Sequence, residues 1–262
     1  MGTIVSTIED GVLLLRLRNG TVNAMSSDMA RQLKMTVAEL PDGVGAVVVA
    51  GTDDGAFCAG SDIRELRKLE QANSGPEPLL RVESEALRAL AAVSVLTIAA
   101  VDGVAFGGGM ELAACCDFVI AGERARFCLP EIMLGVFPGL GGTVWIPRRV
   151  GYARALDLMI TGNEIDATTA QDWSFVNRIV AAGRAADEAM RFARKVASGP
   201  RDAVRMIKLS LRDNFGGNEA TALAAALERA IGLGRSPEAR EGLRAFAARE
   251  KPDFVAARAK RG

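Results

Sequence analysis

Two glutamates, Glu111 and Glu131, could act together as a general acid and a general base. Glu111 comes two residues after Gly107-Gly108-Gly109, where an apolar strand is predicted to turn into a helix. Glu131 follows in Leu129-Pro130-Glu131-Ile132. The chain has no histidine, so acid–base chemistry near neutral pH would depend on two carboxylates in unlike surroundings.

The three glycines could bind an oxygen that becomes negatively charged during a reaction. The first N–H groups of a helix lack partners within the helix and lie at the positive end of its dipole. Glycine also lets a substrate approach the backbone closely. The alternative is that these glycines only allow tight packing of strand and helix. A second strand-to-helix turn, at Phe57-Cys58-Ala59-Gly60-Ser61-Asp62, could direct another N–H group at the same oxygen.

Two nucleotide-binding motifs fail on detail. The dinucleotide motif needs a third glycine, but counting from Gly107 gives Leu112 and counting from Gly139 gives Val144. A phosphate loop needs a lysine after its last glycine, and Gly141-Gly142-Thr143 has none. This second glycine cluster is therefore expected to open a packed helix.

Composition narrows the class of protein. The 262 residues are 49% hydrophobic, enough for a substantial core. Lys plus Arg and Asp plus Glu both number 32, which argues against a general nucleic-acid binder. The sequence lacks a signal peptide and any apolar run of about 18 residues, so we expect a soluble cytoplasmic protein without a membrane span. The four cysteines form no Cys-x-x-Cys pair and are expected to be buried free thiols in a reducing compartment, without a metal.

The elements expected from the pattern describe an α/β protein with a helical C-terminal third. A hairpin is predicted from two strands at the N-terminus, and Ser26 or Ser27 is predicted to cap the first helix. Strands are expected at 3–7, 12–17, 46–50, 96–101 and 118–121. Helices are expected at 26–40, at 63–93 with a break at 73–76, and at 151–161, 185–198, 200–213, 218–232 and 236–250.

These residues resemble the crotonase, or enoyl-CoA hydratase/isomerase, superfamily, and enoyl-CoA hydratase most closely. The resemblance is carried by Phe57-x-Ala-Gly-x-Asp62, by the block from Ala100 to Asp117 that contains the triple glycine and Glu111, by Pro130-Glu131-Ile132 and by Gly141-Gly142-Thr143. It implies a crotonase-like spiral of repeated ββα units with a C-terminal helical trimerisation region. Residues 1–195 would form the core with the acyl-CoA site, and residues 196–262 would serve oligomerisation and closure of the CoA pocket.

The resemblance also implies a site. The backbone N–H groups of Ser61 and Gly108 would form an oxyanion hole for the thioester carbonyl, and Glu111 and Glu131 would be the catalytic glutamates. No metal and no redox cofactor are expected, because coenzyme A is part of the acyl-CoA substrate. The protein would be a homotrimer or a dimer of trimers. Residues expected to contact CoA are Ala59, Asp62, Ile63, Arg64, Arg249 and Lys251.

Retention of both glutamates favours hydration of a trans-2-enoyl-CoA, a reaction of fatty acid metabolism, with Glu111 as the base and Glu131 as the acid. Two alternatives remain: an enoyl-CoA double-bond isomerase that uses Glu131, and a catalytically idle acyl-CoA-binding subunit. The chain departs from the family at Arg18-Asn19-Gly20-Thr21-Val22, beside the expected nucleotide pocket, and at Trp173, which could fill the core or reach a subunit contact.

Overall fold

The computed structural model describes residues 2–52 and 55–259. Its strands are β1 (Thr3–Glu9), β2 (Val12–Arg18), β3 (Ala46–Ala50), β4 (Leu96–Val101), β5 (Val104–Phe106), β6 (Phe118–Gly122), β7 (Arg126–Cys128), β8 (Ile165–Asp166) and β9 (Arg178–Val180). Its helices are α1 (Ser27–Ala38), α2 (Ile63–Gln71), α3 (Glu77–Ala92), α4 (Gly108–Cys115), the 3-10 helix η1 (Pro130–Leu134), α5 (Gly142–Val150), α6 (Tyr152–Thr161), α7 (Ala167–Asp172), α8 (Ala185–Ala197), α9 (Arg201–Asn214), α10 (Glu219–Leu233), α11 (Pro237–Ala248) and α12 (Phe254–Ala259).

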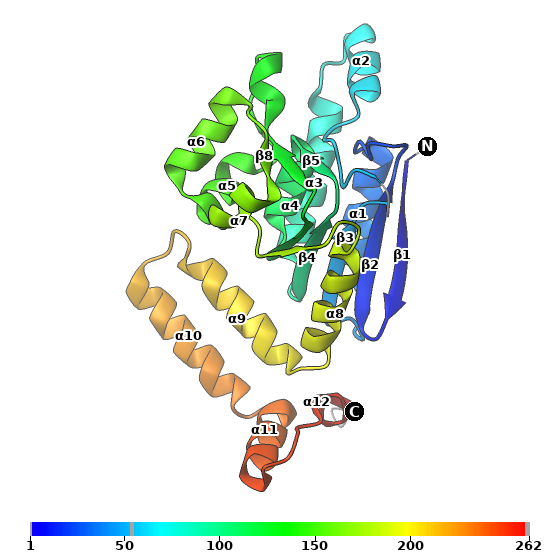
Figure 1. Cartoon of the computed structure of the whole chain (residues 1–262). Helices are drawn as coiled ribbons and strands as arrows, with labels where there is room; N and C mark the ends of the chain where they lie inside the picture. The colour runs from blue at the N-terminus through cyan, green and yellow to red at the C-terminus, as the bar shows by residue number, and fades with distance from the viewer. Residues whose placement is uncertain (1, 53–54, 260–262) are drawn as a thin grey trace.

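The larger sheet has the strand order β1-β2-β3-β4-β6-β9. The predicted β1–β2 hairpin is confirmed and is antiparallel, whereas the other neighbouring strands are parallel. Side chains of a strand alternate between the two faces. Val47 and Val49 therefore enter the main core with α1, α3 and α4, while Ala46 and Val48 enter a smaller core beneath α8. Helices thus cover both faces of the sheet, and β3 is buried on both sides as its sequence predicts (Figure 1).

A smaller sheet has the strand order β5-β7-β8 and supplies the second strand of each ββα unit. β4 of the larger sheet is followed directly by β5 of the smaller sheet and then by α4, and β6 is followed in the same way by β7 and η1. β5 is the apolar strand expected before the triple glycine, whereas β7 and β8 are not predicted from the sequence, because runs of two or three residues carry no measurable periodicity. The repeated units confirm the crotonase-like fold class.

Helix starts follow the capping chemistry of the sequence. The Ser26 hydroxyl accepts a hydrogen bond from the Met29 amide at 3.3 Å, and the Asp62 carboxylate accepts one from the Arg64 amide at 2.9 Å. The expected break between two helices is confirmed, since α2 ends at Gln71 and α3 begins at Glu77. The second glycine cluster opens α5, as expected. Trp173, the C-cap of α7, is half-buried and packs against the main core, with the Arg154 guanidinium 5.5 Å from the centre of its ring.

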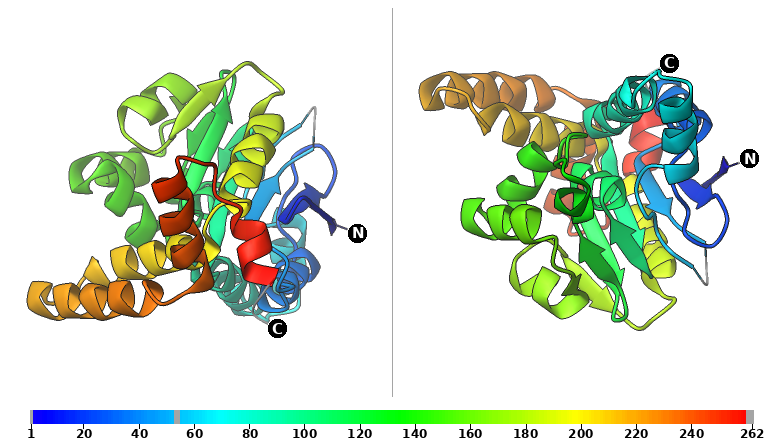
Figure 2. Two further views of the ribbon diagram at one scale, coloured as in Figure 1. Left: turned by 90° about the horizontal axis from the view of Figure 1, so that it is seen from below. Right: turned by 90° about the horizontal axis from the view of Figure 1, so that it is seen from above.

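The C-terminal third is helical, as expected. α9 and α10 form a pair that projects from the rest of the chain, and α11 and α12 pack near the start of α9 (Figures 1 and 2). The Lys208 ammonium on α9 donates hydrogen bonds to the Asp117 carboxylate at 2.6 Å and to the Val95 carbonyl at 2.8 Å. Arg258 on α12 pairs with Glu238 on α11 at 2.8 Å. Among the described residues, no helix combines the length and hydropathy needed to cross a membrane.

Candidate active site

The turn from β5 into α4 can be formed only by glycine at two positions. Gly107 has φ 52° and ψ −126°, a conformation that side-chain-bearing residues rarely adopt. A Cβ on Gly109 would lie 1.9 Å from the Cys58 carbonyl oxygen, so α4 begins in direct contact with the segment after β3. Gly108 is the first residue of α4, and its N–H therefore has no acceptor within the helix.

The amide of Ser61 lies beside that of Gly108. A Cβ on Gly108 would be 3.8 Å from the Ser61 nitrogen, and a Cβ on Gly60 would be 3.2 Å from the Gly108 nitrogen. Ser61 also forms a parallel bridge with Met25, in which the Met25 amide donates to the Gly60 carbonyl and the Asp62 amide donates to the Met25 carbonyl. In this bridge geometry the N–H of Ser61 itself faces away from Met25. The fold therefore brings the two predicted amide donors together from separate elements.

Glu111 is buried on the first turn of α4. Its Oε1 accepts hydrogen bonds from the Leu140 amide at 2.8 Å and the Gly142 amide at 2.7 Å, at the start of α5. Burial raises the pKa of Glu111 to about 7, the Gly142 hydrogen bond opposes that rise, and the nearby Glu131 carboxylate adds to it. A carboxylate that changes protonation near pH 7 is suited to proton transfer.

Glu131 lies in the first turn of η1 and is half-buried. A Cβ atom added to Gly107 would lie 2.9 Å from Oε1 of Glu131. The carboxyl group of Glu131 is therefore in contact with the glycine turn that precedes α4. Its Oε2 is buried and has no hydrogen-bond partner among residues 2–52 and 55–259. Burial raises the pKa of Glu131. The structure therefore brings both predicted glutamates to the same glycine turn, one oxygen of Glu131 remaining available for a ligand or water.

The segment expected to contact CoA begins beside Ser61. Ala59 is half-buried, and its amide donates to the Val22 carbonyl at 3.0 Å. Asp62 is buried as the cap of α2, whereas Ile63 and Arg64 are exposed. The Arg64 guanidinium pairs with Asp62 at 2.7 Å, which holds the pKa of that carboxyl below its usual value.

Arg249 and Lys251, the other residues predicted to contact CoA, belong to a separate part of the chain. Arg249 is the C-cap of α11, and Lys251 follows two residues later. α11 lies at the opposite end of the molecule from α2, as Figure 1 shows. One chain therefore does not bring these two cations to the site that contains Arg64. The reason is that α8 carries the chain to that end, and α10 then returns beside α9, so that α11 begins near the start of α9.

Glu83 is a third acidic residue of this region that the sequence analysis missed. It lies on α3, is fully buried, and its Oε2 accepts a hydrogen bond from the Ser61 hydroxyl at 2.7 Å. Burial raises the pKa of Glu83 to about 8, and the nearby Glu111 carboxylate adds to the rise. The sequence spacing could have predicted that Glu83 is buried. Leu79, Glu83, Ala86 and Leu90 follow one another at intervals of three or four residues, which places Glu83 on the apolar face of the helix.

Replacing Glu83 by glutamine should make the free energy of unfolding less dependent on pH. The folded protein keeps the Glu83 proton up to about pH 8, whereas the unfolded chain releases it near 4.5. The unfolded state thus binds fewer protons between these pH values, so wild-type stability falls as pH rises, by on the order of 5 kcal/mol for this group. Denaturant unfolding at about pH 5 and pH 9 should show Glu83→Gln gaining stability relative to wild type at the higher pH. Glu85→Gln, exposed on the same helix, is the control; an equal response would contradict the assignment.

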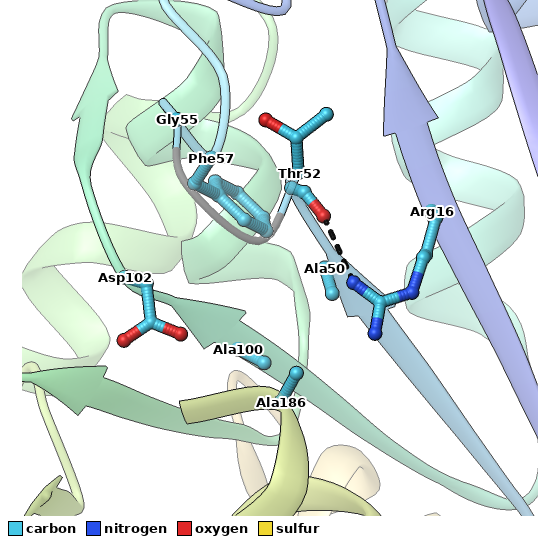
Figure 3. A pocket seen from close by; sticks show the side chains of 9 residues that line it. Arg16, Ala50, Thr52, Gly55, Phe57, Ala100, Asp102 and Ala186 are labelled. Atoms are coloured by element: carbon cyan, nitrogen blue, oxygen red, sulfur yellow. Dashed lines mark hydrogen bonds between the residues drawn. The ribbon is translucent and has the colours of Figure 1, made fainter. Parts of the chain in front are cut away.

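A separate pocket near the C-terminal ends of β3 and β4 is too small for a substrate. Figure 3 shows Phe57, Ala100 and Asp102 around it, with the Arg16 guanidinium donating to the Gly51 carbonyl at 3.5 Å. Its volume is about 10 Å³, room for about one water molecule. Asp102 accepts hydrogen bonds from the amides of Gly183 and Ala185, so it anchors the start of α8.

Fold and site together define a crotonase-fold protein. The family model described as Enoyl-CoA hydratase/isomerase matches residues 7–257. The chain is 36% identical over 239 residues to a Rhizobium meliloti protein named probable enoyl-CoA hydratase, covering 90% of this chain and 91% of that protein. It is 33% identical over 241 residues to the mitochondrial enoyl-CoA hydratase of Pongo abelii, covering 90% and 81%.

The solved structure of an enoyl-CoA hydratase from Bacillus anthracis superposes with a TM-score of 0.90 at 28% identity, covering 96% of this chain and 99% of that one. The chain belongs to the enoyl-CoA hydratase/isomerase family.

Proposed function

We propose that this protein is an enoyl-CoA hydratase, which adds water across a trans-2-enoyl-CoA to give a 3-hydroxyacyl-CoA. The observation that carries the proposal is the meeting of two adjacent backbone amides, Ser61 and Gly108, with two carboxyl groups, Glu111 and Glu131, at one glycine turn. The names of the relatives support the same class of reaction.

The chemistry of hydration requires each of these groups. Addition of water at Cβ builds enolate character on the thioester oxygen, and the amides of Ser61 and Gly108 would stabilise that charge. Ionised Glu111, fixed by two backbone amides, would orient the water and take its proton. Glu131, whose Oε2 is buried without a hydrogen-bond partner in the described residues, would supply the proton at Cα in its protonated form. The roles reverse for dehydration, and the reaction needs no metal or redox cofactor.

A spectroscopic assay tests this function. Incubation with crotonyl-CoA should remove the absorbance of the conjugated thioester and yield 3-hydroxybutyryl-CoA. Conversion of a 3-enoyl-CoA to its 2-enoyl isomer, without hydration of crotonyl-CoA, would instead identify an isomerase that uses Glu131. Tight binding without turnover of either substrate would identify an idle acyl-CoA-binding subunit.

For the CoA moiety, we propose contacts from Ala59, Asp62, Ile63 and Arg64, which lie next to the Ser61 amide in the sequence. Arg64 is exposed apart from its pair with Asp62, so its charge can reach a phosphate group. Arg249 and Lys251 would contribute only if a neighbouring subunit brought its own α11 to this site. The four buried free thiols fit the reducing, cytoplasmic compartment that we propose.

The C-terminal helices are proposed to assemble the protein as a trimer or a pair of trimers. α9 and α10 have no buried residues in the single chain, and α10 exposes the apolar stripe Leu223, Leu227 and Ile231. Leu227→Asp should therefore shift the protein toward monomer in sedimentation velocity, because it introduces a charge into an apolar contact. Glu219→Gln, at the start of the same helix, is the control. A monomeric wild type, or an unaltered trimer of Leu227→Asp, would contradict this interface.

A further inference from the structure

Glu83 has a geometry that neither core packing nor the two-glutamate mechanism explains. It occupies a fully buried position on α3, a helix that packs against α1 and α4. One oxygen, Oε2, accepts from the Ser61 hydroxyl at 2.7 Å. The other, Oε1, is buried and without a hydrogen-bond partner in the described part of the chain. A glutamate with one unsatisfied buried oxygen costs stability, so its presence here indicates a role at the adjacent site.

The surroundings of Glu83 keep it uncharged. The charged groups that act on its pKa are acids: Glu111 on α4, Glu65 on α2, and Asp62 at the cap of α2. Glu65 is bound by the amide and hydroxyl of Ser27, and Asp62 is bound by Arg64.

The cation that α1 directs toward α3, Lys34, pairs with the exposed Glu85 at 2.8 Å. No described cation therefore pairs with Glu83. A buried carboxyl group among other acids, without a cation, keeps its proton at neutral pH.

The contact with Ser61 connects Glu83 to the oxyanion hole. The backbone around Ser61 is held on one side by the Met25 bridge, through the Gly60 carbonyl and the Asp62 amide. The side chain of Ser61 is held on another side by Glu83. Two independent anchors fix the rotation of this residue and so fix the direction of its N–H toward Gly108.

We propose that Glu83 is a positioning residue of the oxyanion hole, which acts through the Ser61 hydroxyl and must stay uncharged to do so. The proposal rests on the proposed function, in which the Ser61 amide binds the thioester oxygen. An ionised Glu83 would add a negative charge beside Glu111 and the developing enolate, and it would oppose the charge that the two amides stabilise.

Three variants separate this role from a merely structural one. Ser61→Ala removes the hydroxyl and keeps the amide, Glu83→Leu removes the anchor, and Glu83→Gln keeps an uncharged acceptor. With crotonyl-CoA, the first two should each lower kcat about tenfold or more with little change in KM, because positioning acts mainly in the transition state. The double variant Ser61→Ala/Glu83→Leu should be no slower than the slower of the two single variants, since both changes break the same contact.

Glu83→Gln should recover most of the kcat lost in Glu83→Leu. Glu85→Gln, two residues further along α3, should match wild type.

A binding measurement keeps the outcome independent of turnover. The infrared C=O stretch of bound butyryl-CoA reports how strongly the amides polarise the thioester, and it should move back toward its solution value in Ser61→Ala and Glu83→Leu. If wild type fails to hydrate crotonyl-CoA, the proposed function is wrong, and the carbonyl frequency alone decides the role of Glu83. An unchanged frequency in both variants, additive losses of kcat, or a Glu83→Gln variant no better than Glu83→Leu would overturn the proposal.

Discussion

Glu131→Gln and Glu111→Gln are each expected to lower kcat for hydration of crotonyl-CoA by about 10²- to 10⁴-fold, the range typical of a lost general acid or base. Glutamine has nearly the shape of glutamate, but it can neither take a proton from water nor give one to carbon. In Glu111→Gln, the new side-chain carbonyl oxygen can still accept the hydrogen bonds from the Leu140 and Gly142 amides, so the start of α5 should remain in place. The loss should therefore appear in kcat, with KM changed only a few-fold.

Glu164→Gln is the matched control for these two variants. Glu164 is exposed and pairs with Arg126 at 3.2 Å, away from the glycine turn in sequence, and surface ion pairs contribute little. Progress curves at about pH 7 should show the control equal to wild type. If either active-site variant also retained wild-type kcat, that glutamate would have no part in proton transfer. Combining both substitutions should not multiply the two losses, because the two carboxyl groups act on one reaction step.

Gly108→Pro is expected to lower kcat by about 10²- to 10³-fold, because proline lacks the N–H that would stabilise the thioester oxyanion. Gly108 is the first residue of α4, the helical position that tolerates proline best. The helix should therefore form, and the circular dichroism and thermal unfolding of the variant should stay close to those of wild type. The substitution removes one hydrogen-bond donor without removing the fold around it.

Gly108→Ala separates the loss of the donor from the added side chain. Alanine keeps the N–H, and its Cβ would lie 3.2 Å from a Leu140 methyl group, a contact that a side chain can relieve by a small shift. Its kcat should thus fall far less than that of the proline variant. Equal losses in the alanine and proline variants would show that crowding, rather than the missing amide, causes the effect. The same comparison with butyryl-CoA would reveal whether the thioester carbonyl loses polarisation in the proline variant alone.

Much of the larger sheet could be predicted from the sequence. The wholly apolar run at 46–50 indicates a strand buried on both faces, and the structure places it at the centre of the larger sheet. Ser26 and Asp62 predict helix starts because their side chains can accept from the first free amides of a helix. The short strands β7 and β8 could not be predicted, since their pairing partners come from distant parts of the chain.

The chemical groups of the candidate site follow from residue types alone: two glutamates, a glycine turn that exposes an amide, and the absence of histidine. Which of these groups meet depends on the folded chain. It placed the Ser61 amide beside Gly108 and buried Glu83 against the Ser61 hydroxyl. It also separated α11, with Arg249, from α2 within one chain. Residue type and spacing set local conformation, whereas the proximity and burial that fix hydrogen bonds and pKa values depend on the packing of segments far apart in sequence.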